Sequence, residues 1–417
     1  MKSLAVGVIA AVWSATFMIA NGYQEFPPGG EEARIGIHIA NGDGFRSPMD
    51  SLPTAPPTAW SPPVYPLIIG AAYRAFGIES ARAIILLLLI NACCFGAIAA
   101  AVHRLGVIIF RSQIPGLITA GLISVHPYFT YYMGNLWDGI VSLAMFLWLV
   151  VAAMEVGSRA RRGQAASGRW AAALGAGMGL LALTNTTYCL TYPVLLLVAC
   201  PRPLQRNHLR FIAATGFIFL LTITPWTIRN YAVFGRLVFV RTPPGVTFWV
   251  GNQPGSSGWL DANAIATLPF VNPSERALLL NVGEPSYDTI ARARFRRGLE
   301  SDPWNFATRC MRRVGYLIAG GPIPPGTMRA RILNLVVAVL ALAGIVWAGR
   351  LGYQQRHVPL LMLCLALPYI PTLVGDRYAL PLRCLLVFYA AAMMWMTARR
   401  ARTPAAFAAG DASGGVR

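Results

Sequence analysis

Acidic residues occur at two places in the sequence, each in a polar stretch next to an apolar segment. Glu31 and Glu32 follow a first apolar block, and Asp138 directly precedes another one. Adjacent carboxylates repel each other, so one of a pair can keep its proton to higher pH and take part in proton transfer. Exposed loop acids are usually only solvated. Asp138 has two readings, a charge favoured by a helix N-terminus or a functional group at a membrane boundary.

Arginines next to apolar segments supply the complementary charge. Arg229 and Arg377 each stand at the end of an apolar block, where a guanidinium would lie at the depth of lipid phosphates. The alternative is an arginine that only snorkels to the interface or, for Arg377, pairs with Asp376. With their neighbours they form the set of candidate phosphate-binding and substrate-binding residues: Arg34, Arg229, Asn230, Arg377 and Tyr378.

Metal binding stays open at the level of sequence. Glu31, His126 and Asp138 are potential ligands, but they come from separate segments without the spacing of a metal site. The seven cysteines lie mostly within apolar blocks, which favours packing over a disulfide framework. No cofactor is therefore predicted with certainty, and a divalent cation is one option.

The elements that must hold these residues are apolar helices. The chain has 417 residues, of which 56% are hydrophobic and only 12% charged, a balance that excludes an ordinary soluble protein. A hydrocarbon layer about 30 Å thick needs roughly 20 apolar residues in a helix. Blocks of about this length without Asp, Glu, Lys or Arg cover residues 4–20, 83–102, 114–132, 139–154, 211–228, 332–349, 358–375 and 384–398.

The uncharged stretch 170–200 is too long for one membrane span and too short for two full ones. The polar cluster 184–187 and Pro193 interrupt it, which predicts two short helices. Arginines flank the stretch on both sides, and short arginine-rich loops stay in the cytoplasm, so the chain must enter and return on one side. The expected total is therefore about ten membrane-embedded helices.

The charge distribution predicts the orientation of these helices. Arginine-rich connections and both chain ends fall on one side, which is then cytoplasmic, whereas fourteen of the sixteen acids fall on the other. The net charge of +19 then reflects topology and attraction to membrane lipids rather than nucleic-acid binding. We expect a multi-pass protein of a bacterial inner membrane whose first span is retained, not a cleaved signal peptide.

Two outer segments, about 21–79 and 229–331, are too long to be simple connectors. Within them we expect helices that lie along the membrane, one over 64–76 and one that begins at Pro303. The second has an apolar face, with Arg309, Arg312 and Arg313 expected near lipid phosphates. Residues 1–400 are predicted to form one domain, followed by a disordered cytoplasmic tail over 401–417.

The order of these motifs resembles the GT-C superfamily of membrane glycosyltransferases, in the branch of protein O-mannosyltransferases and lipid A aminoarabinose transferases. The resemblance covers roughly residues 20–395, and no single motif in it is specific. It rests on the acidic motif 31–45, the proline-rich run 57–66, Asp138, the block 224–235, Gly251-Asn252, and Arg377-Tyr378 with Pro381.

The resemblance implies an all-α polytopic bundle of about ten transmembrane helices, with juxtamembrane helices in the first outer loop and a long second outer loop. It implies inverting transfer of a sugar from a polyprenyl-phosphate-linked donor to a glycan, lipid or protein acceptor at the outer face. Glu31 resembles the general base, with Glu32 as the fallback. Asp138 resembles a second acid that orients the acceptor or helps to hold a cation.

Two departures from the family pattern bear on this assignment. Many relatives have Asp where this chain has Glu31, and many have Arg where it has Asn185. If the arginine of those relatives binds the donor phosphate, Arg229 or Arg377 would have to make this contact here. The competing readings are a transporter or lipid-linked sugar flippase, and a catalytically inactive scaffold. A transporter would place ionisable groups near the membrane midplane, whereas the acids here gather at one face.

Overall fold

The computed structural model describes residues 1–21, 30–164, 167–201, 203–321, 328–353, 355 and 357–402. Within these residues the chain is helical, and its only extended pairings are two isolated bridges, Arg46 with Pro57 and Trp259 with Val374. The fold class predicted from composition is therefore confirmed.

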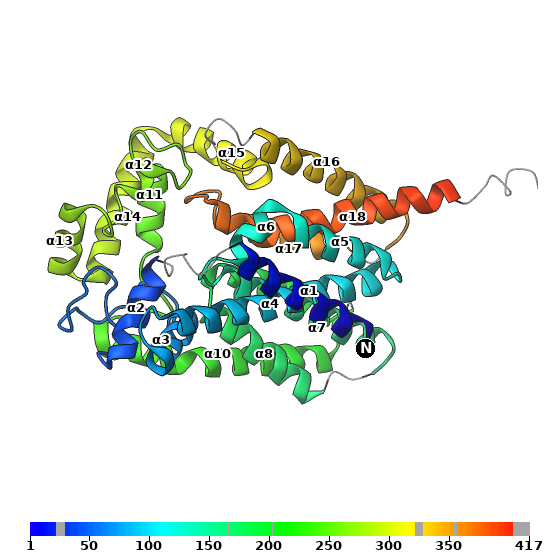
Figure 1. The fold of residues 1–417 in the computed structure, drawn as a ribbon, viewed down its shortest axis with the longest axis horizontal. Helices are drawn as coiled ribbons and strands as arrows, with labels where there is room; N and C mark the ends of the chain where they lie inside the picture. Colours follow the sequence, from blue (N-terminus) through cyan, green and yellow to red (C-terminus); the bar gives the residue numbers. More distant parts are fainter. Residues whose placement is uncertain are drawn as a thin grey trace, which may run out of the picture.

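Six long helical segments are apolar enough to cross a membrane, which makes the chain a multi-pass membrane protein. They run along the long axis of the molecule (Figure 1). The segments are α1 (Lys2–Ala20), α4 (Ala81–Phe110), α7 (Gly139–Arg161), α10 (Arg206–Phe234), α16 (Met328–Arg350), and α18 (Leu380–Arg402) with the preceding 3-10 turn η3 (Asp376–Ala379).

The other four predicted spans are short or broken. α5 (Ile114–Val125) is followed at once by α6 (Pro127–Met133). The stretch 170–200 forms α8 (Gly168–Ala182), the 3-10 helix η2 (Thr186–Thr191) and α9 (Tyr192–Ala199), which confirms two short helices around a polar turn.

The span predicted over 358–375 needs a correction. Only its first part is helical, as α17 (His357–Ala366), and the backbone from Leu367 to Gly375 is irregular. Pro368 and Pro371 cannot continue the intrahelical hydrogen bonds. Irregular backbone is tolerated at membrane depth where it lines a cavity, and this segment does so.

Small residues let the spans approach closely. A Cβ atom built on Gly96 of α4 would lie 2.4 Å from the carbonyl oxygen of Gly7 in α1. A Cβ atom on Gly344 of α16 would lie 2.4 Å from the carbonyl oxygen of Tyr389 in α18. Such small-residue contacts are a main source of helix association in lipid, where burial of apolar side chains gives little advantage.

The outer elements gather at one end of the bundle, at the left of Figure 1, away from the N-terminus and from the end of α18. Both ends of the described bundle therefore lie on the same side; its assignment to the cytoplasm stays a prediction. The outer helices are α2 (Gly30–Asn41), α3 (Val64–Phe76), α11 (Pro244–Asn252), α12 (Ala262–Ile265), α13 (Pro273–Val282), α14 (Glu284–Ser301) and α15 (Pro303–Ala319).

A second, smaller apolar core holds most of these outer helices together. It includes Trp60 from the proline-rich run, Val250 from α11, Leu279 from α13, Tyr287 from α14 and Leu373 from the irregular segment after α17. The first and second outer loops thus share one core, and the last part of the chain contributes to it.

Helix α15 begins as predicted, because the Asp302 carboxylate accepts a hydrogen bond from the Asn305 amide at 2.9 Å. The prediction that its arginines lie near lipid phosphates is wrong for two of them. Arg309 and Arg313 are buried, and Arg313 is fully so. They turn inward because carbonyl oxygens of α11 and of the segment after α17 accept their hydrogen bonds, including Asn252 O and Ile370 O.

The contact between α1 and α4 gives a testable prediction. Gly96→Val should force the two helices apart and lower the stability by about 1–3 kcal/mol, the usual cost of overpacking. The measurement is the thermal midpoint of the purified protein in detergent. Gly121→Val in α5 is the matched control, because no atom lies within 4 Å of a Cβ built there. Equal midpoints for the two variants would contradict the close contact.

Candidate active site

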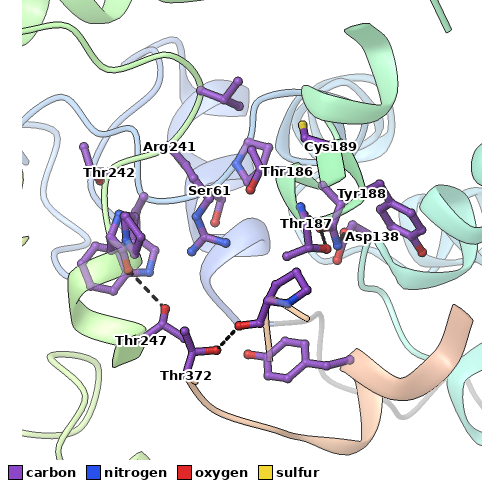
Figure 2. Close-up of a pocket in the computed structure, with 18 of the residues that line it drawn as sticks. Ser61, Asp138, Thr186, Thr187, Tyr188, Cys189, Arg241, Thr242, Thr247 and Thr372 are labelled. Carbon is purple, nitrogen blue, oxygen red and sulfur yellow. Dashed lines mark hydrogen bonds between the residues drawn. The ribbon is translucent and has the colours of Figure 1, made fainter. Parts of the chain in front are cut away.

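A cavity of about 1190 Å³ lies where the long helices meet α2, α11 and α14. Its walls also come from the start of α7, η2, the middle of α10 and the irregular segment after α17. Figure 2 shows its polar lining, in which Asp138, Thr187, Ser61 and Arg241 come from four different segments.

The three predicted acids line this cavity together. Glu31 and Glu32 occupy the first turn of α2, where a helix N-terminus favours negative charge. Glu31 Oε2 accepts a hydrogen bond from the indole Nε1 of Trp60 at 3.2 Å. Asp138 is the N-cap residue of α7, where a helix N-terminus favours its charge, but its side chain makes no capping hydrogen bond. The same side chain lines the cavity, so its position agrees with both interpretations of Asp138.

Asn185 fixes the carboxylate of Asp138. Its side-chain amide nitrogen donates to Asp138 Oδ2 at 2.7 Å. Its oxygen accepts hydrogen bonds from the amide and the hydroxyl of Thr187, at 3.1 and 2.6 Å. Since these bonds occupy the oxygen, the amide group must present its nitrogen to Asp138. The residue that replaces an arginine of many relatives thus acts here as a neutral donor to the second acid.

Arg377 and Tyr378 also line the cavity. The Arg377 guanidinium lies over the Trp137 ring, 5.0 Å from its centre, and donates from Nη2 to the Tyr378 hydroxyl at 3.2 Å. Its Nε has no hydrogen-bond partner among the described residues. Tyr378 in turn stacks on Tyr369 with ring centres 5.0 Å apart. A rigid aromatic frame therefore holds a cation with an unused donor at the cavity wall.

Arg241 is a cavity residue that the sequence analysis missed. Figure 2 shows its side chain directed into the cavity from the segment between α10 and α11. Its charge acts on both Glu32 and Asp138. In the sequence, only its position directly after the apolar residues 237–240 could have indicated Arg241 as a candidate site residue.

Arg229 is placed elsewhere, outside the cavity lining. It donates from Nη1 to the carbonyl oxygen of Thr58 at 2.6 Å and from Nη2 to that of Phe45 at 3.1 Å. Its guanidinium also stacks over Trp226, 4.8 Å from the ring centre. These contacts use the donors of Arg229 to brace the first outer loop against α10.

Asn230 and Arg34 also brace loops rather than line the cavity. The Asn230 side chain is fully buried and donates to the carbonyl oxygens of Val238 and Val240, at 3.1 and 3.3 Å. It thereby holds the segment that leads to Arg241. Arg34 is exposed and donates to the carbonyl oxygen of Pro48 at 3.3 Å.

Burial raises the pKa of Glu32 well above its ordinary value, and the nearby charges of Asp138 and Glu31 raise it further. Arg377 and Arg241 act in the opposite direction on the same carboxyl. The Glu32 side chain is only 7% exposed, which is consistent with burial as the main cause. Of the two adjacent glutamates, Glu32 is therefore the one suited to keep its proton.

A divalent cation stays an open prediction. Among the residues that the structure describes, no three His, Cys, Asp or Glu side chains come together in an arrangement that could hold a metal ion. His126 lies away from the cavity, where its Nδ1 accepts a hydrogen bond from the Tyr128 amide at 3.2 Å.

Comparison with solved structures gives a distant likeness. No protein family and no curated protein matches the sequence. The crystal structure of ArnT from Cupriavidus metallidurans bound to undecaprenyl phosphate has 15% sequence identity and a TM-score of 0.39, over 96% of this chain and 77% of that one. The apo structure of the same protein has 17% identity and a TM-score of 0.37, over 94% and 78%. The likeness spans nearly the whole chain but is too low to assign an activity.

The pKa of Glu32 gives a prediction on stability. An acid whose pKa is raised by folding does not lower the free energy of unfolding below its unfolded pKa of about 4.3. As the pH rises toward the folded pKa, it lowers this free energy increasingly. Glu32→Gln should therefore melt like the wild type near pH 4.5 and be at least about 1 kcal/mol more stable at pH 8. Thermal unfolding in detergent at both pH values measures this.

The control is Glu300→Gln, because Glu300 is an exposed acid at the end of α14. This substitution should leave the thermal stability unchanged at either pH. A Glu32→Gln protein that is less stable than the wild type at pH 8 would contradict the raised pKa.

Proposed function

We propose that the protein is a membrane glycosyltransferase that moves a sugar from a polyprenyl-phosphate-linked donor to an acceptor hydroxyl at the outer membrane face. The observation that carries the proposal is one cavity in an apolar bundle whose lining brings the carboxyl groups of Glu31, Glu32 and Asp138 together with several arginines, among them Arg241 and Arg377. The resemblance of the motifs to GT-C glycosyltransferases supports the same reaction.

The flank of the cavity near the membrane suits an amphiphilic donor. Leu190, Leu220, Leu237 and Phe239 line the cavity, yet each is at least 48% exposed. In a membrane protein such side chains meet lipid, so an isoprenoid chain could lie against them while its phosphate and sugar reach the polar end.

Arg377 and Arg241 are our candidates for the donor phosphate. Charge builds on this phosphate as the bond to the anomeric carbon breaks, and fixed cations in a partly buried site stabilise that charge strongly. Arg377 lines the cavity, and Tyr378 holds its guanidinium in place. Arg229 is less suited, because two carbonyl oxygens already accept its hydrogen bonds.

Glu31 is our candidate for the general base. Its carboxylate would take the proton from the acceptor hydroxyl as that oxygen attacks the anomeric carbon from the face opposite the phosphate, which inverts the configuration. Trp60 orients one carboxylate oxygen and leaves the other for the acceptor. Glu32, with its raised pKa, would act as a donor of a hydrogen bond rather than as the base. Asp138, held by Asn185, would orient the acceptor.

The test of the base and of the second acid uses Glu31→Gln and Asp138→Asn. Both variants should lose roughly 100- to 10,000-fold in rate, the usual contribution of a positioned general base. The assay measures sugar transfer in proteoliposomes from a panel of undecaprenyl-phosphate-linked hexoses and pentoses. Glu300→Gln is the control and should keep full activity. Full activity of both site variants would refute the assignment, and substrate flux without transfer would favour a transporter.

The two arginine roles can be separated in the same assay. Arg377→Gln and Arg241→Gln should each lower kcat/KM for the donor about tenfold or more, because a charged contact to phosphate contributes about 1.5–3 kcal/mol. Arg229→Gln should instead lower the thermal midpoint, since it removes contacts to Thr58 and Phe45. A donor-specific defect in Arg229→Gln, with unchanged stability, would reverse this assignment.

A further inference from the structure

A buried carboxylate outside the cavity connects the two sides of the proposed site. Glu284, the first residue of α14, is 6% exposed and does not line the cavity. It accepts hydrogen bonds from the hydroxyl of Thr58, from the amide of Ala59 at 2.9 Å and from the hydroxyl of Thr242 at 2.8 Å. A helix of the second outer loop thus holds two segments that are far apart in the sequence.

One of these segments leads directly to Glu31. The Thr58 hydroxyl, which donates to Glu284, also accepts a hydrogen bond from the amide of Trp60 at 3.0 Å. The indole of Trp60 then donates to Glu31 Oε2 at 3.2 Å. Two hydrogen bonds therefore connect Glu284 to the backbone of Trp60, and the Trp60 side chain itself reaches the proposed base.

The other segment leads to Arg241. Thr242, whose hydroxyl donates to Glu284, is the next residue after Arg241. The amide of Thr242 donates to the carbonyl oxygen of Ala59 at 2.9 Å, so the two segments are also joined to each other. The position of Arg241 in the cavity thus depends on the same carboxylate as the position of Trp60.

Burial raises the pKa of Glu284, whereas its hydrogen bonds and the nearby Arg229 guanidinium favour the ionised form. Oε2 accepts from both segments, from the Ala59 amide and from the Thr242 hydroxyl, and Oε1 accepts from the Thr58 hydroxyl. A glutamine would place an NH₂ group where one of these oxygens accepts, and each buried polar group left unpaired costs about 1–3 kcal/mol.

We propose that Glu284 is a positioning residue for the reaction, which sets the place of Glu31 through Trp60 and that of Arg241 through Thr242. This role rests on the proposed glycosyl transfer, in which Glu31 is the base and Arg241 contacts the donor phosphate. Glu284 itself touches neither substrate.

The connection can be tested without any activity measurement. Hydrogen exchange measured by mass spectrometry should show at least about tenfold faster exchange in Glu284→Gln for peptides that cover both 57–61 and 240–244. The matched control is Glu275→Gln, in the same outer region, whose carboxylate accepts from Tyr287 and Arg294 instead. It should leave both peptides unchanged. Faster exchange in only one peptide, or in neither, would overturn the shared connection.

The effect on the base is tested by measuring kcat in single and double variants. Because Trp60 orients the Glu31 carboxylate, Trp60→Phe should lower kcat. Glu284→Gln should lower kcat as well, and the double variant should lower it no further than the larger single effect. Glu284→Asp should restore part of the lost kcat.

Two outcomes separate this role from its alternatives. A double variant in which the losses of kcat from Glu284→Gln and Trp60→Phe simply multiply would overturn the positioning role through Trp60 and leave Glu284 as a purely structural group. Full activity of Glu31→Gln would instead refute the proposed base, and with it the role of Glu284 toward Glu31. The exchange experiment would still decide whether Glu284 joins the two segments.

Discussion

Backbone polar groups at membrane depth must form hydrogen bonds within the protein, and a continuous helix satisfies them all. The cavity lies where helices are interrupted and these bonds are missing. The breaks lie before α7, between α8 and η2, and after α17, and all three line the cavity. Side chains supply the missing donors. Asn91 donates to the carbonyl oxygens of Met133 and Asn135, and Asn252 donates to that of Pro371. The same interrupted helices that open space for a substrate are thus held in place by buried amides.

The charges in this space constrain one another. Repulsion from Asp138 and Glu31 adds to burial in raising the pKa of Glu32, whereas Arg377 and Arg241 act in the opposite direction. Asn185 adds a donor without adding charge, which lets Asp138 stay oriented without another cation. An arginine at position 185 would add a positive charge beside Asp138. Asn185 therefore changes the net charge of the cavity relative to the family that this chain resembles.

The sequence predicted the elements well because their signals are local. Uncharged blocks located the spans, and the polar interruption at 184–187 located the short helices on either side. Asp138 could be placed at the cavity because it begins a span. The partners of buried groups were not predictable, because they depend on long-range packing. Arg229, like Arg377, stands at the end of an apolar block, yet it donates its hydrogen bonds to the carbonyl oxygens of Thr58 and Phe45. Glu284 sits in a polar helix whose sequence gives no sign of burial.

The cavity draws its residues from almost the full length of the chain, from Glu31 at one end to Tyr378 at the other. During synthesis the ribosome must add nearly everything between them, which takes roughly 20 to 70 seconds at about 5–20 residues per second. A nascent chain that has already inserted its first spans therefore has no complete cavity until the segment after α17 has been synthesised.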